Sequence, residues 1–291
     1  MIVEKCYCPA SIEEAVTLLA HHCGEMQICA GGTDLFVMMR KGKSQCRYLL
    51  DISGLNLASI TKKPDGTISN GAGVTLSEVQ RNEYLSHPAF QALQKAARHV
   101  GSLQIRNMAT LVGNICTGIT SADTAVPLLA LDAHVKLVSK HGSRLLPLTE
   151  FFIKPRQTAV ESDELVTEII LKDYQDTRCQ SYFRKVGTRK ELLISIFNAA
   201  ALLFLADDGT VRSAMLAMGV VAPIPIRLLK TEAFLTGKKM DNEVVEKAVA
   251  IMQEEIHPRS SFHGSEEYRR LLAANILREF LTDAHQNWLG R

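Results

Sequence analysis

The spacing of apolar positions in the first fifty residues changes between helical and strand periods. The capping-box pattern Ser11–Glu14 opens a series of apolar residues three and four apart, which predicts a helix ending near Gly24. The apolar run Met26–Ala30 predicts a strand, residues 35–40 a helical turn, and residues 47–53 a second strand. Helices and strands in alternation indicate a small α/β unit.

A second unit of similar pattern follows. A Pro-Asp-Gly turn precedes a predicted strand at residues 68–73, and Thr75–Glu78 is another capping box. Beyond it, the pattern predicts helices at 88–100 and 123–131, a hairpin at 134–148 turning at His141-Gly142, and a strand at 164–171.

After the polar stretch 173–178 the pattern changes. Apolar runs joined by an Asp-Asp-Gly turn predict an antiparallel meander, whose first run, SYFRKVGTRKELLIS, extends from 181 to 195. Strands followed by helices are typical of the α+β class. The helices are predicted at 227–235, 242–256 and 265–285. We therefore expect an N-terminal domain at 1–172, with subdomains of about 1–56 and 57–172, and a C-terminal α+β domain at 179–291.

The segment QICAGGTDL, Gln27–Leu35, carries the first candidate chemistry. Its glycine pair, Gly31 and Gly32, can adopt positive φ and leaves the backbone open to another molecule. Thr33 or Asp34 can cap the following helix, whose first N–H groups and dipole attract anions such as phosphate. A plain strand-turn-helix junction is the alternative interpretation.

A second stretch of the same kind lies within residues 104–137, where glycine, asparagine and small hydroxylated residues stand between apolar runs. We interpret it as a second loop that holds the other side of one pyrophosphate. Asp34 and Asp123 each stand beside such a stretch, where a carboxylate either accepts a ribose or ribityl hydroxyl or caps a helix. In FRKVGTRK, alternation predicts that Lys185 and Arg189 face one side, either toward a cleft between domains or toward solvent.

Composition and the absence of certain motifs exclude several classes of protein. A net charge of +2 provides no basic face for nucleic acid. No apolar run approaches the roughly 20 residues of a membrane span, and the first residues lack a signal-peptide pattern, so we expect a cytoplasmic protein. The seven cysteines include no C-x-x-C pair, and the nine histidines no H-E-x-x-H, so we expect free thiols and no metal site. The sequence also contains neither the G-x-x-x-x-G-K-[ST] phosphate-binding loop of nucleoside triphosphatases nor the G-x-S-x-G motif of serine hydrolases.

Five motifs in order along the chain carry a family resemblance. The motifs are AGGTDL at 30–35, QIRNMATLVGN at 104–114 with SAD at 121–123, F-x-K-x-G-x-R at 183–189, VAPIPIR at 221–227 and EYRR at 267–270. With these motifs the chain resembles the FAD-binding medium subunit of molybdenum hydroxylases, and within that family it is most similar to the FAD-binding subunits of bacterial xanthine dehydrogenases. The resemblance covers essentially the whole chain.

The resemblance implies a two-subdomain FAD-binding domain of the PCMH type, followed by a C-terminal domain like that of the CO dehydrogenase flavoprotein. It also implies which residues contact FAD. The implied FAD contacts are Gln27, Ile28, Cys29, Ala30, Gly31, Gly32, Thr33 and Asp34 in the first stretch, Ala109, Thr110, Leu111, Val112, Gly113, Asn114, Thr117 and Asp123 in the second, and Val166 and Lys185 near the flavin. One of these residues, Val112, departs from the family pattern, which has glycine at this position.

By the same resemblance the chain carries electrons and has no catalytic residue of its own. A molybdopterin-binding large subunit would oxidise the substrate, a small subunit with [2Fe–2S] clusters would relay electrons, and FAD would pass them to NAD. Two alternatives stay open at this point. One is a stand-alone FAD-dependent oxidoreductase with its own substrate, and the other is a scaffold that has lost FAD, suggested by Val112.

Overall fold

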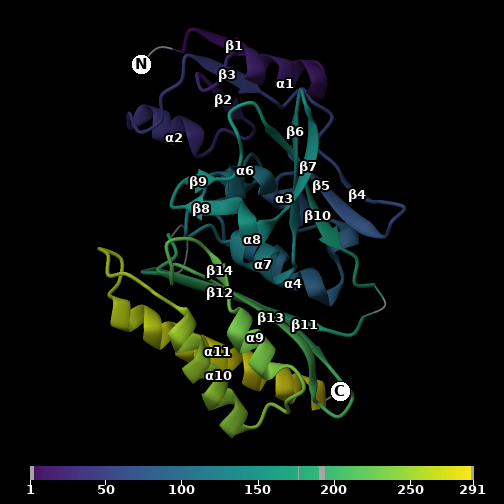
Figure 1. Ribbon diagram of the computed structural model, residues 1–291, viewed down its shortest axis with the longest axis vertical. Helices are drawn as coiled ribbons and strands as arrows, with labels where there is room; N and C mark the ends of the chain where they lie inside the picture. Colours follow the sequence, from purple (N-terminus) through teal and green to yellow (C-terminus); the bar gives the residue numbers. More distant parts are fainter. Residues whose placement is uncertain (1–2, 176, 190–193, 290–291) are drawn as a thin grey trace.

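The chain folds into an elongated molecule with the N-terminal sheet at one end and the C-terminal helices at the other (Figure 1). A computed structural model describes residues 3–175, 177–189 and 194–289. The elements group around three larger sheets, and the order of these sheets along the long axis follows the order of the sequence.

The first unit is a three-stranded parallel sheet in which β3 lies between β1 and β2. Helices connect successive strands, which is why the strands can run parallel. At the start of the first helix the hydroxyl of Ser11 accepts a hydrogen bond from the N–H of Glu14. The Glu14 carboxylate accepts from the N–H of Ala10, and not from the N–H of Ser11 as a capping box requires. The elements are β1 (Lys5–Tyr7), α1 (Ile12–His21), β2 (Met26–Cys29), α2 (Leu35–Arg40) and β3 (Tyr48–Asp51).

The second unit is a five-stranded antiparallel sheet with β10 at its centre. Its short helices gather on one side of the sheet (Figure 1). The capping box predicted at Thr75–Glu78 is present in full. The strands, in the order of the sheet, are β4 (Ile60–Lys62), β5 (Thr67–Gly71), β10 (Leu165–Lys172), β6 (His134–Ser139) and β7 (Gly142–Pro147).

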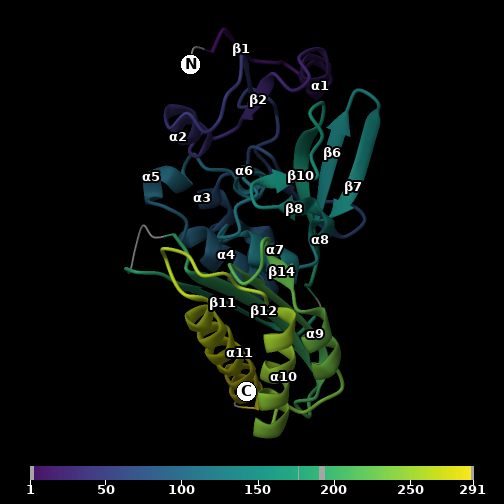
Figure 2. The same cartoon turned by 60° about the vertical axis from the view of Figure 1, so that its left-hand side comes forward.

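The connections of this unit hold several short elements that lie near the centre of the molecule (Figure 2). Two of them, β8 and β9, form a small hairpin of their own. The elements are α3 (Leu76–Val79), the 3-10 turns Glu83–Leu85 and Pro88–Phe90, α4 (Gln91–Arg98), α5 (Leu103–Arg106), α6 (Leu111–Cys116), α7 (Ala125–Ala130), α8 (Leu148–Phe151), β8 (Phe152–Lys154) and β9 (Gln157–Thr158).

The C-terminal part is a four-stranded antiparallel sheet covered on both faces. Helices α9 and α11 pack on one face, while α4 and α7 of the second unit pack on the other (Figures 1 and 2). This explains why almost every residue of β12 is buried and why its sequence reads as a continuous apolar run. The elements are β11 (Gln180–Val186), β12 (Phe197–Leu205), β13 (Val211–Gly219), β14 (Ile226–Arg227), α9 (Leu229–Leu235), α10 (Asn242–Glu255) and α11 (Glu266–Leu289).

Alternate residues of β12 belong to two hydrophobic cores. Ala200 and Leu202 pack into the core of the N-terminal units, and Ala201 and Leu203 pack into the core formed with the C-terminal helices. Each face of the C-terminal sheet therefore stabilises a different half of the molecule, and the sheet is held against the second unit.

The predicted α+β class is confirmed, and several local predictions need correction. The stretch after Ala109, predicted as a loop, begins the helix α6. The first meander run ends at Val186, and its residues 190–193 lie outside the described part. The hairpin turns at Lys140-His141, since Ser139 pairs with Gly142.

Candidate functional site

A cavity of about 730 Å³ lies where the first unit, the second unit and the C-terminal sheet meet. This is the size of sites that enclose cofactors and similar ligands, about 300–1,000 Å³. All of the residues predicted to contact a cofactor line it except Leu111, whose side chain is buried in the core. The two stretches selected from the sequence, seventy residues apart, therefore enclose one space.

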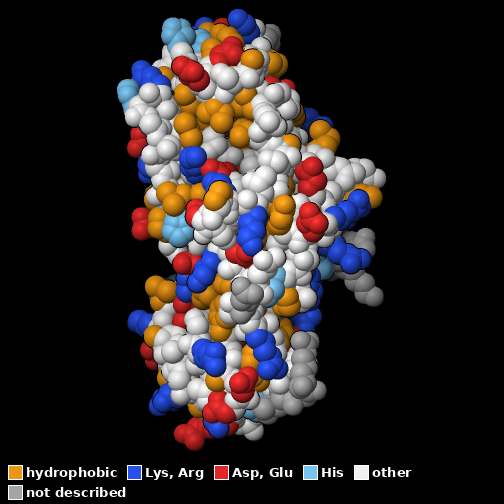
Figure 3. Space-filling model, turned by 90° about the vertical axis from the view of Figure 1, so that its right-hand side faces the viewer, with side chains coloured by type: hydrophobic (Ala, Val, Ile, Leu, Met, Phe, Trp, Pro, Cys, Tyr) orange, Lys and Arg blue, Asp and Glu red, His pale blue; other side chains and the backbone are white. Residues whose placement is uncertain are grey.

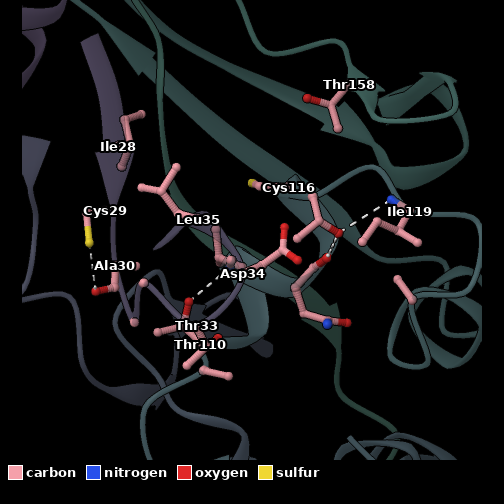
Figure 4. Close-up of a pocket in the computed structure, with 18 of the residues that line it drawn as sticks. Ile28, Cys29, Ala30, Thr33, Asp34, Leu35, Thr110, Cys116, Ile119 and Thr158 are labelled. Atoms are coloured by element: carbon pink, nitrogen blue, oxygen red, sulfur yellow. Dashed lines mark hydrogen bonds between the residues drawn. The ribbon is translucent and has the colours of Figure 1, made fainter. Parts of the chain in front are cut away.

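The first glycine stretch forms a tight turn between β2 and α2 (Figure 4). Gly32 has φ of +67°, a conformation that favours glycine. The sequence also permits positive φ at Gly31, but Gly31 does not adopt it. The backbone N–H groups of Gly32, Thr33, Asp34 and Leu35 make no hydrogen bond within the described part of the chain. Four consecutive donors without a protein acceptor, beside a cavity, suit the oxygens of a phosphate.

Gly31 has a different role from the one that positive φ would give it. A Cβ atom added there would lie 1.9 Å from the carbonyl oxygen of Met108 and 3.1 Å from Cα of Ala109. The backbone of the first stretch thus lies directly against the backbone that leads into the second. Only glycine permits this approach, which holds both stretches at the same end of the cavity.

The second stretch is the first turn of α6. The Thr110 hydroxyl caps this helix by accepting from the N–H of Gly113 at 2.9 Å. Thr110 also forms a β-bridge with Thr75, the N-cap of α3, which fixes the start of α6 against the start of α3. Val112, the departure from the family pattern, is 5% exposed and packs in the core, so its side chain does not fill the cavity.

Neither predicted acid caps a helix through its side chain. Asp34 occupies the N-cap position of α2 but makes no capping hydrogen bond, and its side chain lines the cavity near Thr33 (Figure 4). The residue before α7 is Thr124, which also caps nothing, and Asp123 is buried instead among residues of the C-terminal sheet. The helix-cap alternative is therefore wrong for the side chains of both acids.

Asp123 accepts from three side chains of the C-terminal part. Lys185 donates to one carboxylate oxygen at 2.5 Å, and Ser195 and Asn198 donate to the other at 2.6 and 3.0 Å. Lys185 and Asn198 are cross-strand partners in β11 and β12, so they leave the sheet on the same face. This network closes the cavity on the side of the C-terminal sheet.

Lys185, from the predicted basic run, lines the cavity. Its ammonium group donates to the His99 carbonyl at 3.0 Å as well as to Asp123. An ammonium has three N–H groups, so the third can donate to a further acceptor. The alternation predicted for Arg189 does not apply, because β11 ends at Val186.

The thiol of Cys29 stands at the end of β2 beside the turn (Figure 4). Burial, and then the nearby Asp51 carboxylate, raises the pKa of this thiol above its ordinary value. Cys29 therefore stays protonated and neutral at physiological pH, and no thiolate repels a phosphate at this end of the cavity.

Sequence reasoning missed several cavity residues that come from other elements. Arg156 has a left-handed backbone, φ 62°, in the turn between β8 and β9, and no motif marks it. Ser195 is the last residue of a run predicted to be a continuous strand, which hid its role beside Asp123. Ile119 and Thr158 lie on the side of the cavity across from β2 (Figure 4). The position of these residues depends on tertiary contacts alone.

The residues present fit FAD in two respects. The turn at Gly32 supplies bare N–H donors for a diphosphate, and the contact of Gly31 with the Met108 backbone brings the second stretch to the same end. The other end, between Val166 and Lys185, offers an apolar surface beside a cation, as a flavin ring with a polar edge requires.

In the part of the chain that the structure describes, no helix is long and apolar enough to cross a membrane.

The fold and the cavity define a two-part α+β protein built around a site for an elongated, phosphate-bearing cofactor. Residues 2–171 match the family described as the FAD binding domain in molybdopterin dehydrogenase, and residues 181–284 match the CO dehydrogenase flavoprotein C-terminal domain. The chain belongs to this molybdopterin dehydrogenase family as an FAD-binding oxidoreductase subunit. The family resemblance and the FAD cofactor predicted from the sequence are thereby confirmed.

Individual relatives cover nearly the whole chain but differ in what they are named for. It is 30% identical over 276 residues to the xanthine dehydrogenase FAD-binding subunit of Escherichia coli O157:H7, covering 94% of each chain. It is 30% identical over 283 residues to the nicotinate dehydrogenase FAD-subunit of Eubacterium barkeri, covering 95% of this chain and 94% of that one. Among solved structures, carbon monoxide dehydrogenase from Hydrogenophaga pseudoflava matches with a TM-score of 0.88 at 27% identity, covering 98% of both chains.

Proposed function

We propose that this chain is the FAD-carrying electron-transfer subunit of a molybdenum hydroxylase of xanthine dehydrogenase type. In this role it receives electrons from [2Fe–2S] clusters in a small partner subunit, and a large molybdopterin-binding subunit oxidises the substrate. NAD is the final acceptor. Bound FAD supplies the chemistry that joins single-electron delivery to the two-electron reduction of NAD.

The observation that carries the proposal is that both glycine stretches line one cavity. The N–H groups after Gly31 hold the diphosphate, and the close contact of Gly31 with Met108 sets the distance between the two stretches. Lys185, held by Asp123, presents a positive charge to the polar edge of the flavin, and Val166 covers part of the ring and excludes water there. The chain itself needs no acid–base pair, because it positions the cofactor and does not activate a substrate.

The family of relatives supports the choice of partners but leaves the substrate open. Subunits named for xanthine, nicotinate and carbon monoxide are all similar to this chain. The xanthine and nicotinate relatives match equally well, at 30% identity over 94–95% of this chain, so we place the protein with xanthine dehydrogenase on the motif resemblance in its sequence. A cytoplasmic location agrees with its use of NAD and with its free cysteines in a reducing compartment.

Isolation of the tagged chain from its source cells tests this proposal. We expect a yellow protein that releases FAD on denaturation and co-elutes with iron- and molybdenum-bearing chains. The complex should reduce NAD with a purine. A lone, active oxidase would instead support the stand-alone FAD oxidoreductase, and a colourless protein that takes up no added FAD would support the scaffold alternative.

The variant Gly32→Leu tests the position of the phosphate in the same system. A leucine at φ of +67° is strained, and its Cβ would lie 2.4 Å from the Phe36 ring, so the turn that presents the N–H groups would have to shift. We expect flavin occupancy to be abolished. Unchanged occupancy would show that the diphosphate lies elsewhere.

A further inference from the structure

A second cavity, of about 590 Å³, lies where the five-stranded sheet of the second unit meets the C-terminal sheet. Among the described residues, none lines both this cavity and the cofactor cavity. Its volume is within the range of sites that enclose small molecules, about 300–1,000 Å³. Strands of the five-stranded sheet lie on the right of Figure 1, and Figure 3 shows that side of the molecule, where apolar side chains lie among charged ones of both signs. FAD binding and electron transfer leave this second cavity without a role.

One wall of the second cavity is the face of the five-stranded sheet that points away from the core. Alternation along β10 buries Ile169 and Leu171 and turns Ile170 and Lys172 to the other face. His134 of β6 is the cross-strand partner of Ile170, so its side chain stands on the same face. Ile170, Lys172 and His134 all line the cavity. This wall therefore combines an apolar residue with two side chains that carry nitrogen.

The opposite wall is largely aromatic. Phe204 of β12 and Ser213 of β13 are cross-strand partners, and Met215 follows on the same face of β13. The ring of Tyr174, in the connection from β10 to β11, lies 5.8 Å from the Phe204 ring. The Tyr174 hydroxyl donates to the Leu131 carbonyl at 3.4 Å, and burial raises the pKa of this phenol to about 12. This wall is therefore neutral and presents ring surface to the cavity.

Lys172 brings a positive charge that no carboxylate neutralises in the described part of the chain. The pairing of β6 with β10 ends before Asp132, whose backbone is left-handed with φ of 52°. Continued pairing would place Asp132 across from Lys172, but its carboxylate accepts instead from Arg227 at 3.1 Å. Asp173, the next residue after Lys172, pairs with Lys62 at 2.6 Å. Both acids are engaged by other cations, so Lys172 is left for an anionic ligand.

We propose that this cavity binds a flat aromatic molecule that carries a carboxylate. Its rings pack against Tyr174 and Phe204 on one side and Ile170 on the other, and its carboxylate pairs with Lys172. One unpaired lysine matches the single charge of a carboxylate better than the charge of nearly two on a phosphate group. The inference goes beyond the proposed function, because it assigns a second ligand to the chain.

The shape of the site favours a small molecule over a protein partner. A stable protein interface buries about 800 Å² on each partner over a broad surface. Here two sheet faces bound a hollow with an apolar lining and a few polar side chains, which is the usual construction of a small-molecule site.

The strand β12 connects the two cavities and sets the distance between them. Asn198 donates to Asp123 in the wall of the cofactor cavity, and Phe204 lies further along the same face of β12, in the second cavity. At about 3.3 Å per residue, the two positions on β12 are roughly 20 Å apart. A ligand in the second cavity therefore does not reach the Asp123 network, and FAD content can report the folding of variants made there.

Isothermal titration of the purified, FAD-saturated protein with 2-naphthoate tests the proposal. We expect a single site per chain. 2-Naphthalenemethanol, which has the same rings without the charge, should bind about threefold more weakly or worse, because it cannot pair with Lys172. Cyclohexanecarboxylate, which keeps the charge without an aromatic ring, should bind about fivefold more weakly or worse.

Four variants locate the probe. Ser213→Trp and Leu145→Trp fill the cavity from the C-terminal sheet and from β7, and we expect each to abolish binding. Lys172→Gln should weaken the binding of 2-naphthoate about threefold or more and leave that of 2-naphthalenemethanol unchanged. Lys140→Gln is the matched control, because this lysine is exposed at the turn of the β6–β7 hairpin and does not line the cavity. It should bind 2-naphthoate like the wild type.

Each result decides for or against the second site. No binding of 2-naphthoate to the wild type would overturn it, as would binding only to FAD-free protein, which would place the probe in the cofactor cavity. Equal affinity for the acid and the alcohol, or wild-type affinity in Lys172→Gln, would overturn the role of the lysine. Unchanged binding in a tryptophan variant that keeps its FAD would place the probe elsewhere. The two tryptophans enter from different sheets, so one variant decides if the other does not fold. None of these results bears on electron transfer through FAD.

Discussion

The Nζ atom of Lys185 lies 2.5 Å from Oδ2 of Asp123, and both side chains are almost fully buried, with 6% and 7% exposed. The two residues are 62 positions apart, in the predicted C-terminal and N-terminal domains. A charged pair at this depth ties the C-terminal sheet to the wall of the cofactor cavity. It also explains why Asp123 is not a helix cap: its oxygens are taken up by three donors from the other half of the molecule.

Removing the charge of Asp123 should be costly. In Asp123→Asn the Lys185 ammonium stays buried without a counter-ion, and we expect the free energy of unfolding to fall by about 3–5 kcal/mol. Urea unfolding of the apoprotein measures the change. Glu246→Gln, which breaks the exposed pair with Arg278, is the control and should have little effect. If Asp123→Asn is as stable as the wild type, the ion pair does not hold the two halves together.

Gly31→Ala should separate the two glycine stretches. The new methyl group would lie 1.9 Å from a backbone carbonyl, which cannot move aside as a flexible side chain can. We expect FAD to bind at least tenfold more weakly, a loss of about 1.4 kcal/mol or more. Flavin fluorescence titration measures it.

Gly42→Ala is the matched control for this variant. Gly42 has φ of +68° and no atom within 4 Å of the added Cβ, so the substitution introduces backbone strain of about 1–2 kcal/mol without a clash. Its FAD affinity should stay at the wild-type value. Normal FAD binding by Gly31→Ala would mean that the contact between the stretches is not needed.

Val112→Gly tests whether the departure from the family pattern affects the cofactor. Because the valine packs in the core, its removal should destabilise the apoprotein by about 2–4 kcal/mol through lost burial and the low helix propensity of glycine. FAD affinity should not improve. Urea unfolding and flavin titration give the two values, and tighter FAD binding by the glycine variant would contradict the buried position of this side chain.

Glu168 should make stability depend on acid pH. Burial acts to raise the pKa of this carboxyl, but hydrogen bonds from Lys63, Ser69 and Lys136 outweigh it and hold the pKa below the ordinary 4.5. A group with a depressed pKa stabilises the fold above its unfolded value, and this contribution is lost as pH falls through the folded value.

Glu168→Gln should therefore lower stability at pH 7 and reduce the loss of stability on acidification below about pH 4.5. Urea midpoints at several pH values measure both effects. The control is Glu243→Gln, at an exposed residue without an ion pair in the described chain. Parallel pH profiles for wild type and Glu168→Gln would show that this carboxyl does not contribute.

Local pattern was sufficient for most helices and strands. The capping box at Thr75, the short strand before Gly31 and the apolar period of residues 242–256 each depend on neighbours in sequence. Prediction was wrong where distant contacts decide. The stretch after Ala109 reads as a loop, yet it forms a helix because Val74 and Thr75 bind its first residues. The run after Val186 reads as one strand but does not continue as one.

The class of the protein and the two glycine stretches that line its cofactor cavity could be identified from the sequence alone. Glycines, caps and apolar periods act over a few residues, and the order of motifs identifies the family. The tertiary structure decided what these residues do. Gly31 is needed because a distant backbone lies against it, and Asp123 is an anchor because β11 and β12 bring Lys185 and Asn198 to the same carboxylate. Such contacts form only when chain segments far apart pack together, so no local pattern encodes them.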